Sequence, residues 1–180
     1  MNACESILGL SPYQGGKPIE ELARELGLTK ISKLASNENP LGVSSKVKKA
    51  INDSLSSINR YPDGNCFELK KAIAIKHNVA TEMISLGNGS NELLELIARV
   101  FVSKHTDEVI FSQYAFVVYP LVTQALGATA SVSPAKNFSH DLNSMLSMIT
   151  KNTKLIFVAN PNNPTGTLLS DDDVYSFLKQ

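Results

Sequence analysis

The sequence predicts an α/β protein with three layers, in which helices cover both faces of a mostly parallel sheet. From residue 83 onward strand patterns alternate with helix patterns, which is typical of parallel strands joined by helical crossovers. The strand pattern at 154–160 is apolar throughout, as expected for a strand that is covered on both faces. Residues 1–42 lack this alternation, so we expect them to form an N-terminal arm and loop ahead of a domain at 43–180.

Helical spacing of apolar residues predicts three helices in the first 78 residues, at 19–27, 44–58 and 66–77. The segment "NRYPDGN" separates the last two and reads as a turn, because it combines Pro, Asp and Gly. In the alternating part, we expect strands at 83–89, 107–112, 128–133 and 154–160, and helices at 90–102, 116–127, 140–150 and 170–180.

Composition excludes several classes of partner. Seventeen basic residues balance seventeen acidic ones, which argues against binding to nucleic acid or to acidic membrane surfaces. No apolar run reaches the roughly 18 residues of a membrane helix, and the first residues lack a signal-peptide pattern, so we expect a cytoplasmic protein. Cys4 and Cys66 lie far apart, which predicts free thiols, and no His or Cys spacing suggests a metal site.

The stretch "GNGSNE" follows a predicted strand and opens a predicted helix. Gly87 and Gly89 allow a sharp turn, and Ser90 and Asn91 begin the helix, so free backbone amides and the helix dipole favour a phosphate there. A dinucleotide fingerprint needs glycine where Glu92 stands, and a P-loop needs Gly-Lys-Ser/Thr, so neither motif fits. A plain glycine turn with Ser90 as the helix cap is the alternative.

Two further stretches follow predicted strands. Phe116 and Tyr119 are three residues apart and could present a flat face to a planar heterocycle, although such a pair is more often part of a core. In "NPNNPTG", at 160–166, two prolines and Gly166 restrict the backbone, which leaves Asn163 with a rigidly held amide that can donate to an anionic oxygen. A simple loop of turn-forming residues is the alternative there.

These stretches carry a family resemblance. In order, "SNENPLG", "RYPDG", "GNGSNELLELIARVF", "YAFVVYP" and "NPNNPTG" resemble the N-terminal half of a fold type I, pyridoxal-phosphate-dependent aminotransferase. Histidinol-phosphate aminotransferases are the most similar branch, because "PYQGGKPIEELARELGL" also resembles their N-terminal arm. The resemblance implies an incomplete large domain, without the small C-terminal domain.

The resemblance also implies roles for individual residues toward pyridoxal phosphate. Gly89, Ser90 and Asn91 would hold the cofactor phosphate. Phe116 would stack on the pyridine ring, where many relatives have Tyr, and Asn163 would hydrogen-bond the phenolic oxygen.

Other implied contacts involve substrate and a second subunit. In such loops the Asn163–Pro164 peptide bond is expected to be cis. Tyr61 would reach across a homodimer interface to the partner's cofactor phosphate, and Tyr13 and Asn37 would contact substrate.

No residue of the chain is expected to supply the family's central catalytic group. That group is a lysine that forms a Schiff base with the cofactor, and we expect it beyond Gln180. Lys46, in "SSK", is rejected because it opens a predicted surface helix. We therefore expect an aminotransferase of histidine biosynthesis by ancestry, acting on histidinol phosphate and 2-oxoglutarate, but no transamination and poor stability from these 180 residues alone.

Three alternatives remain open at this point. An aromatic aminotransferase or a threonine-phosphate decarboxylase would share most of these motifs. A truncated, non-catalytic subunit could act by binding a full-length partner. A generic nucleotide-binding α/β domain is disfavoured by the absence of the glycine and lysine signatures.

Overall fold

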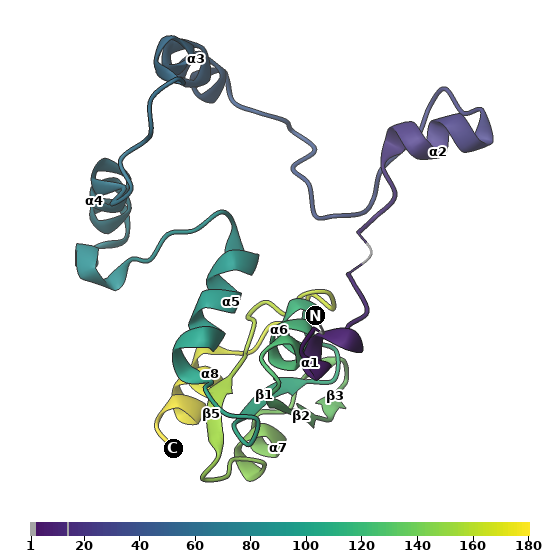
Figure 1. Cartoon of the computed structure of the whole chain (residues 1–180), viewed down its shortest axis with the longest axis vertical. Helices are drawn as coiled ribbons and strands as arrows, with labels where there is room; N and C mark the ends of the chain where they lie inside the picture. Colours follow the sequence, from purple (N-terminus) through teal and green to yellow (C-terminus); the bar gives the residue numbers. More distant parts are fainter. Residues whose placement is uncertain (1–2, 14) are drawn as a thin grey trace. The chain divides into compact units, whose positions relative to one another are not determined.

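The computed structural model describes residues 3–13 and 15–180 (Figure 1). The chain divides into two compact units, one of Gln14–Ser85 and one that combines Met1–Tyr13 with Leu86–Gln180. The sequence-based division into an arm at 1–42 and a domain at 43–180 stays a prediction.

The unit Gln14–Ser85 is helical, as predicted. It contains the α-helices α2 (Ile19–Leu26), α3 (Ser45–Ser54) and α4 (Phe67–His77), and the 3-10 helices η1 (Leu55–Ser57) and η2 (Thr81–Met83). Gly27 ends α2 with a left-handed φ of 63°, which glycine adopts without steric cost. Ser44 caps α3, since its hydroxyl accepts a hydrogen bond from the amide of Val47 at 3.2 Å.

Asp63 explains why the predicted turn at 59–65 leads directly into α4. Its carboxylate accepts hydrogen bonds from the amide of Phe67 at 3.0 Å and from the amide of Asn65 at 2.9 Å. These two bonds, the one from Phe67 foremost, lower the pKa of Asp63.

The other unit is built on a parallel sheet of three strands in the order β2-β1-β5 (Figure 1). The strands are β1 (Glu108–Ser112), β2 (Thr129–Ser133) and β5 (Thr153–Ile156), and an antiparallel hairpin joins β3 (Ala135–Lys136) to β4 (Ser139–His140). The helices of this unit are α1 (Glu5–Leu8), α5 (Ser90–Phe101), α6 (Val118–Ala125), α7 (Leu142–Ser147) and α8 (Asp171–Leu178).

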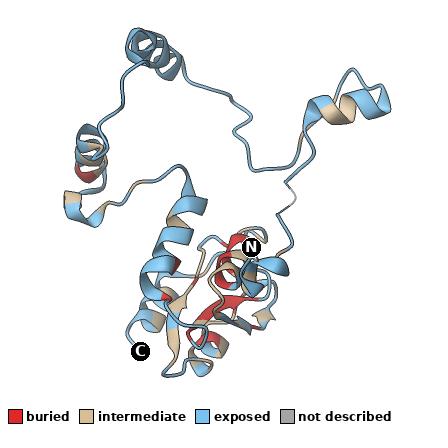
Figure 2. Ribbon diagram, viewed as in Figure 1, coloured by how far each residue is buried: buried red, intermediate tan, exposed pale blue. Residues whose placement is uncertain are grey.

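Side chains of the central strand β1 point alternately to two packed layers. Val109 and Phe111 belong to the buried cluster against which Leu94 of α5 packs. Ile110 between them is fully buried toward the opposite face, where α7 contacts β1 and contributes the fully buried Met145. Figure 2 shows this burial concentrated along the sheet and its nearest helices. The predicted three-layer α/β architecture is thus confirmed.

Two sequence-based expectations about strands need correction. No strand forms at 83–89: Thr81–Met83 is a 3-10 helix, and Ile84 is extended but belongs to no ladder within the described chain. Extended backbone becomes a strand only where a neighbour pairs with it, which local sequence does not report. The strand expected at 154–160 ends at Ile156, and the amide of Phe157 makes the last bond to β1, at 2.8 Å to the carbonyl of Ile110.

The short helix α1 was not predicted. The hydroxyl of Ser6 contacts the carbonyl of Ala125 at 3.4 Å, and α1 packs on α6. Four residues are too few to show a helical period, so this element depends on its tertiary contact.

Large apolar side chains remain exposed on the outer helices α5 and α8. Figure 2 colours most of α5 as exposed. Val100 is 74% exposed and Leu178 is 71% exposed. The expected tendency to aggregate stays a prediction. Within residues 3–13 and 15–180, no helix has both the length and the apolar composition needed to cross a bilayer.

Candidate functional site

The turn before α5 has a backbone that only glycine tolerates at its last position. Gly89 precedes the helix with φ 88° and ψ 170°, and its amide donates to the carbonyl of Gly87 at 2.9 Å. A Cβ added to Gly89 would meet no atom within 4 Å, so the space in front of the helix is open. The N-cap is Gly89, which has no side chain, and Ser90 is the first helical residue, so Ser90 does not cap the helix as the alternative interpretation expected.

The first amides of α5 are therefore left to an outside partner. Ser90 and Asn91 are exposed, and the first four amides of a helix have no intrahelical acceptor. The one acidic side chain of this turn, Glu92, folds back onto the amide and side chain of Asn88. A Cβ on Gly87 would lie 2.7 Å from this carboxylate, so Gly87 makes room for Glu92.

The segment after β1 contains both aromatic residues that the sequence singled out, and they differ in environment. Tyr119 is core: it is 7% exposed and stacks on Phe157 with ring centroids 4.3 Å apart. Burial raises the pKa of the Tyr119 hydroxyl. Phe116 is only half buried and meets Tyr119 edge to face at 6.0 Å.

The loop after β5 is closed by its own backbone. The amide of Asn162 donates to the carbonyl of Thr167, and the amide of Gly166 donates to the carbonyl of Asn162, both at 2.8 Å. Gly166 takes a left-handed φ of 70°, as its role in the motif predicts. The Asn163–Pro164 peptide bond is cis, as expected, and so is the bond before Pro161.

Asn163 itself stands in this loop with its amide free for a ligand. Its side chain is half buried, and no protein group in the described ranges pairs with its amide. The neighbouring side chain of Asn162 differs, because it is 4% exposed and donates to the carbonyl of Tyr114 at 2.9 Å. This bond joins the loop after β5 to the segment after β1.

Most of the predicted cofactor residues thus lie at one end of the sheet. Because β1 and β5 are parallel, the segments that follow them leave from the same edge. Leu94, one turn into α5 from Ser90, packs on the same buried cluster as Phe116. The structure therefore brings α5 and the Phe116 segment onto one shared core, and the Asn162–Tyr114 hydrogen bond joins the Asn163 loop to that segment.

Three predicted residues are not placed with this group. Tyr61 and Asn37 belong to the compact unit Gln14–Ser85, where Tyr61 is fully exposed and Asn37 has a left-handed φ of 50°. Tyr13 lies at the end of the segment that carries α1 and is 59% exposed. Their roles toward substrate and partner subunit stay predictions.

Sequence reasoning missed two residues of this edge, Tyr114 and Asn162. Tyr114 is 39% exposed, and its ring lies against Phe138 with centroids 5.2 Å apart. A local signal for Asn162 did exist, because an Asn three residues before Thr165 in a turn-rich loop can bond it, as it does at 2.8 Å.

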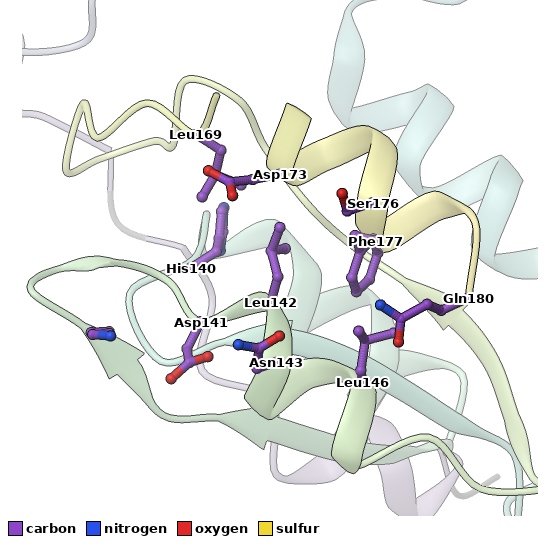
Figure 3. A pocket seen from close by; sticks show the side chains of 11 residues that line it. His140, Asp141, Leu142, Asn143, Leu146, Leu169, Asp173, Ser176, Phe177 and Gln180 are labelled. Carbon is purple, nitrogen blue, oxygen red and sulfur yellow. The ribbon is translucent and has the colours of Figure 1, made fainter. Parts of the chain in front are cut away.

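A separate pocket of about 270 Å³ lies between α7 and α8, where Leu142 and Asn143 face Asp173 and Phe177 (Figure 3). His140 lines it and contacts the carbonyl of Ala159 through Nε2 at 2.9 Å. None of the predicted cofactor residues lines this pocket. Across the described ranges, His, Cys, Asp and Glu side chains do not gather in groups of three that could hold a metal ion.

Comparison with protein-family models finds a match to "Aminotransferase class I and II" over residues 29–179. The chain belongs to this aminotransferase family. The expected membership in the aminotransferase family is thereby confirmed.

Two bacterial members of the family are closely similar in sequence. Histidinol-phosphate aminotransferase 1 of Mannheimia succiniciproducens is 59% identical over 172 residues, which cover 96% of this chain and 47% of the relative. Histidinol-phosphate aminotransferase 1 of Idiomarina loihiensis is 59% identical over 169 residues, which cover 94% of this chain and 46% of the relative. The chain thus spans about half the length of these relatives.

Solved aminotransferase structures share the fold. The histidinol-phosphate aminotransferase of Sinorhizobium meliloti, in complex with pyridoxal-5'-phosphate, superposes with a TM-score of 0.85 at 24% identity over 97% of this chain and 46% of that one. The enzyme of Clostridium acetobutylicum gives a TM-score of 0.69 at 26% identity, covering 80% and 42%. The expected fold is confirmed.

Proposed function

We propose that this chain provides the phosphate-binding and ring-binding part of a pyridoxal phosphate site, in an enzyme that transfers an amino group between histidinol phosphate and 2-oxoglutarate. The observation that carries the proposal is the uncapped start of α5, with an open glycine, on the same core as Phe116, together with the Asn163 loop that is bonded to the Phe116 segment. Histidinol phosphate is the substrate in the names of the similar relatives, and 2-oxoglutarate is the amino acceptor that the family resemblance implies. When bound, pyridoxal phosphate supplies an electron-withdrawing ring that stabilises negative charge at the substrate's α-carbon.

The start of α5 would hold the phosphate group. The amides of Ser90 and Asn91 carry the positive end of a helix dipole, equivalent to roughly half an elementary charge. Gly89, whose amide donates to the carbonyl of Gly87, would contribute open backbone that lets the phosphate approach. A phosphate placed there satisfies donors that the protein leaves without a side-chain cap. The open space in front of Gly89 fits this use, since backbone must approach the phosphate closely.

The other two segments would hold the ring. Phe116 offers an aromatic face whose opposite side is supported by the core. Asn163 would donate from its amide to the phenolic oxygen, which stabilises the ionised form of that oxygen and thereby tunes the ring. Asn163 has the freedom to do so because its amide has no protein partner in the described part of the chain.

Proton transfer at the α-carbon would require the family's lysine, which the resemblance puts after Gln180. We therefore propose cofactor binding as the role of residues 1–180. Tyr13 and Asn37 would contact substrate, and Tyr61 would serve the partner's site in a homodimer. A cytoplasmic location accords with a biosynthetic family of this kind.

Binding of pyridoxal phosphate to the 180-residue chain tests this proposal. Titration followed by absorbance should show saturable binding, inorganic phosphate should compete, and pyridoxal, which lacks the phosphate, should bind more than tenfold more weakly, because it loses charge-assisted hydrogen bonds. Equal affinity for pyridoxal and pyridoxal phosphate would contradict a phosphate site at α5.

The substrate is tested with a protein that spans the relatives' full length. Purified and loaded with cofactor, it should convert histidinol phosphate faster than phenylalanine or threonine phosphate. A preference for an aromatic amino acid would favour the aromatic-aminotransferase alternative instead.

A further inference from the structure

We infer that Asn162 is a positioning residue, which fixes the loop 160–166 against the segment 113–116 and so sets where the Asn163 amide stands relative to the Phe116 ring. The inference rests on the proposed function, because pyridoxal phosphate is the ligand that both groups would contact. Asn162 itself would not touch the ligand, since it is 4% exposed and its amide is engaged with protein.

The side chain of Asn162 connects two parts of the chain that are far apart in sequence. Its Nδ2 donates to the carbonyl of Tyr114, 48 residues away, at 2.9 Å, and to the hydroxyl of Thr165 at 2.8 Å. The carbonyl of Tyr114 lies two residues before Phe116. One side-chain amide therefore spans from the ring segment to the loop that presents Asn163.

The backbone of Asn162 holds the same loop together. It pairs with Thr167 and Gly166, and the hydroxyls of Thr165 and Thr167 lie 3.0 Å apart. The loop is thus an internally bonded unit, and the bond to Tyr114 ties that unit to the exit of β1. Without this bond, the loop could shift as a whole relative to Phe116.

Within the protein, the side chain of Asn162 acts through its donor group. Its Oδ1 is buried and has no hydrogen-bond partner in the described part of the chain, whereas its Nδ2 makes two hydrogen bonds. Aspartate has nearly the same shape but no donor, and its charge would repel the Tyr114 carbonyl.

Asn160 provides a matched control in the same loop. Its side chain also makes two hydrogen bonds, both to the backbone of Leu169, at 2.8 and 3.2 Å. None of its bonds reaches the 113–116 segment. Asn160→Ala therefore removes a similar number of loop contacts without releasing the loop from β1.

The test compares wild type, Asn162→Ala, Asn162→Asp and Asn160→Ala in the full 180-residue chain. Three quantities are measured for each: affinity for pyridoxal phosphate, affinity for inorganic phosphate by phosphorus NMR, and amide hydrogen exchange at 113–117. Both Asn162 variants should bind pyridoxal phosphate about five- to tenfold more weakly, the effect of losing the one hydrogen bond that Asn163 would make to the ligand, and should exchange faster at 113–117. Phosphate affinity should not change, and Asn160→Ala should behave as wild type in all three.

Two results would overturn the inference alone, with wild-type binding intact. One is an equal loss of affinity for pyridoxal phosphate and for phosphate in the Asn162 variants, which would mean that the substitution disturbs the whole site and not the position of Asn163. The other is an equal effect of Asn160→Ala. A wild-type chain that binds no pyridoxal phosphate would instead overturn the proposed function and, with it, the positioning role.

Discussion

Substitution of Gly89 gives the sharpest test of the α5 site. Gly89→Ala puts a Cβ on a residue with φ 88° and ψ 170°, a region that is almost exclusive to glycine and costs other residues about 1–3 kcal/mol. The new Cβ itself meets nothing within 4 Å, so the effect comes from backbone conformation and not from a clash. The variant would relax to another turn, which would aim the amides of Ser90 and Asn91 elsewhere.

To bind the phosphate, the variant must return to the strained turn. The free energy that this return costs is subtracted from the binding free energy, so the affinity falls. Because 1.4 kcal/mol corresponds to a factor of ten, the affinity for pyridoxal phosphate should fall by about tenfold or more. Titration of wild type and variant measures this directly, and urea unfolding measures the change in stability.

Gly27→Ala is the matched control for Gly89→Ala. Gly27 also has a positive φ, of 63°, and a Cβ there also meets nothing within 4 Å, but it ends α2 in the other compact unit. It should lower stability by about 1 kcal/mol and leave affinity for pyridoxal phosphate unchanged. If Gly89→Ala bound the cofactor as wild type does, the account of the phosphate site would be refuted.

Three further predictions concern single side chains. Asn163→Ala should weaken pyridoxal phosphate binding about fivefold and spare phosphate binding, as parallel titrations would show. Tyr119→Ala should lower the free energy of unfolding by about 3–5 kcal/mol, because it removes a buried ring stacked on Phe157; a loss near zero in urea unfolding would contradict its place in the core. A hydrogen bond from the backbone amide of Ser103 lowers the pKa of Asp107 in the folded state. The ionised carboxylate therefore stabilises the fold at pH values above its unfolded pKa, and this contribution is lost as the pH falls through its lower folded pKa. In Asp107→Asn, the free energy of unfolding should therefore fall less steeply as the pH is lowered into the acid range than it does in wild type, and an equal fall in both would contradict this.

Local sequence patterns predicted most helices because their ends carry local signals. Ser170 caps α8 and Gly27 ends α2 where their residue types indicate. The strand expected at 83–89 was wrong because pairing with a neighbouring strand is a non-local property. The early end of β5 at Ile156 has the same origin, since an apolar pattern continues past the point where pairing with β1 stops.

The part of the candidate site that consists of backbone amides could be proposed from the sequence. Glycines before a helix indicate an anion site from sequence, and the open, uncapped start of α5 agrees with this. The tie between Asn162 and Tyr114 could not be predicted, because its two ends lie 48 residues apart and only the folded sheet brings them together. Nor could sequence assign Tyr119 to the core and leave Phe116 at the edge, since both rings fit either environment.

The most direct test of the central claim is an NMR titration of the isotope-labelled 180-residue chain with pyridoxal phosphate, with inorganic phosphate as the comparison. The account predicts that phosphate shifts the backbone amides of Gly89, Ser90 and Asn91, and that pyridoxal phosphate shifts these and also the side-chain amide of Asn163. Shifts at the start of another helix, such as α8, with those three amides unmoved, would contradict it.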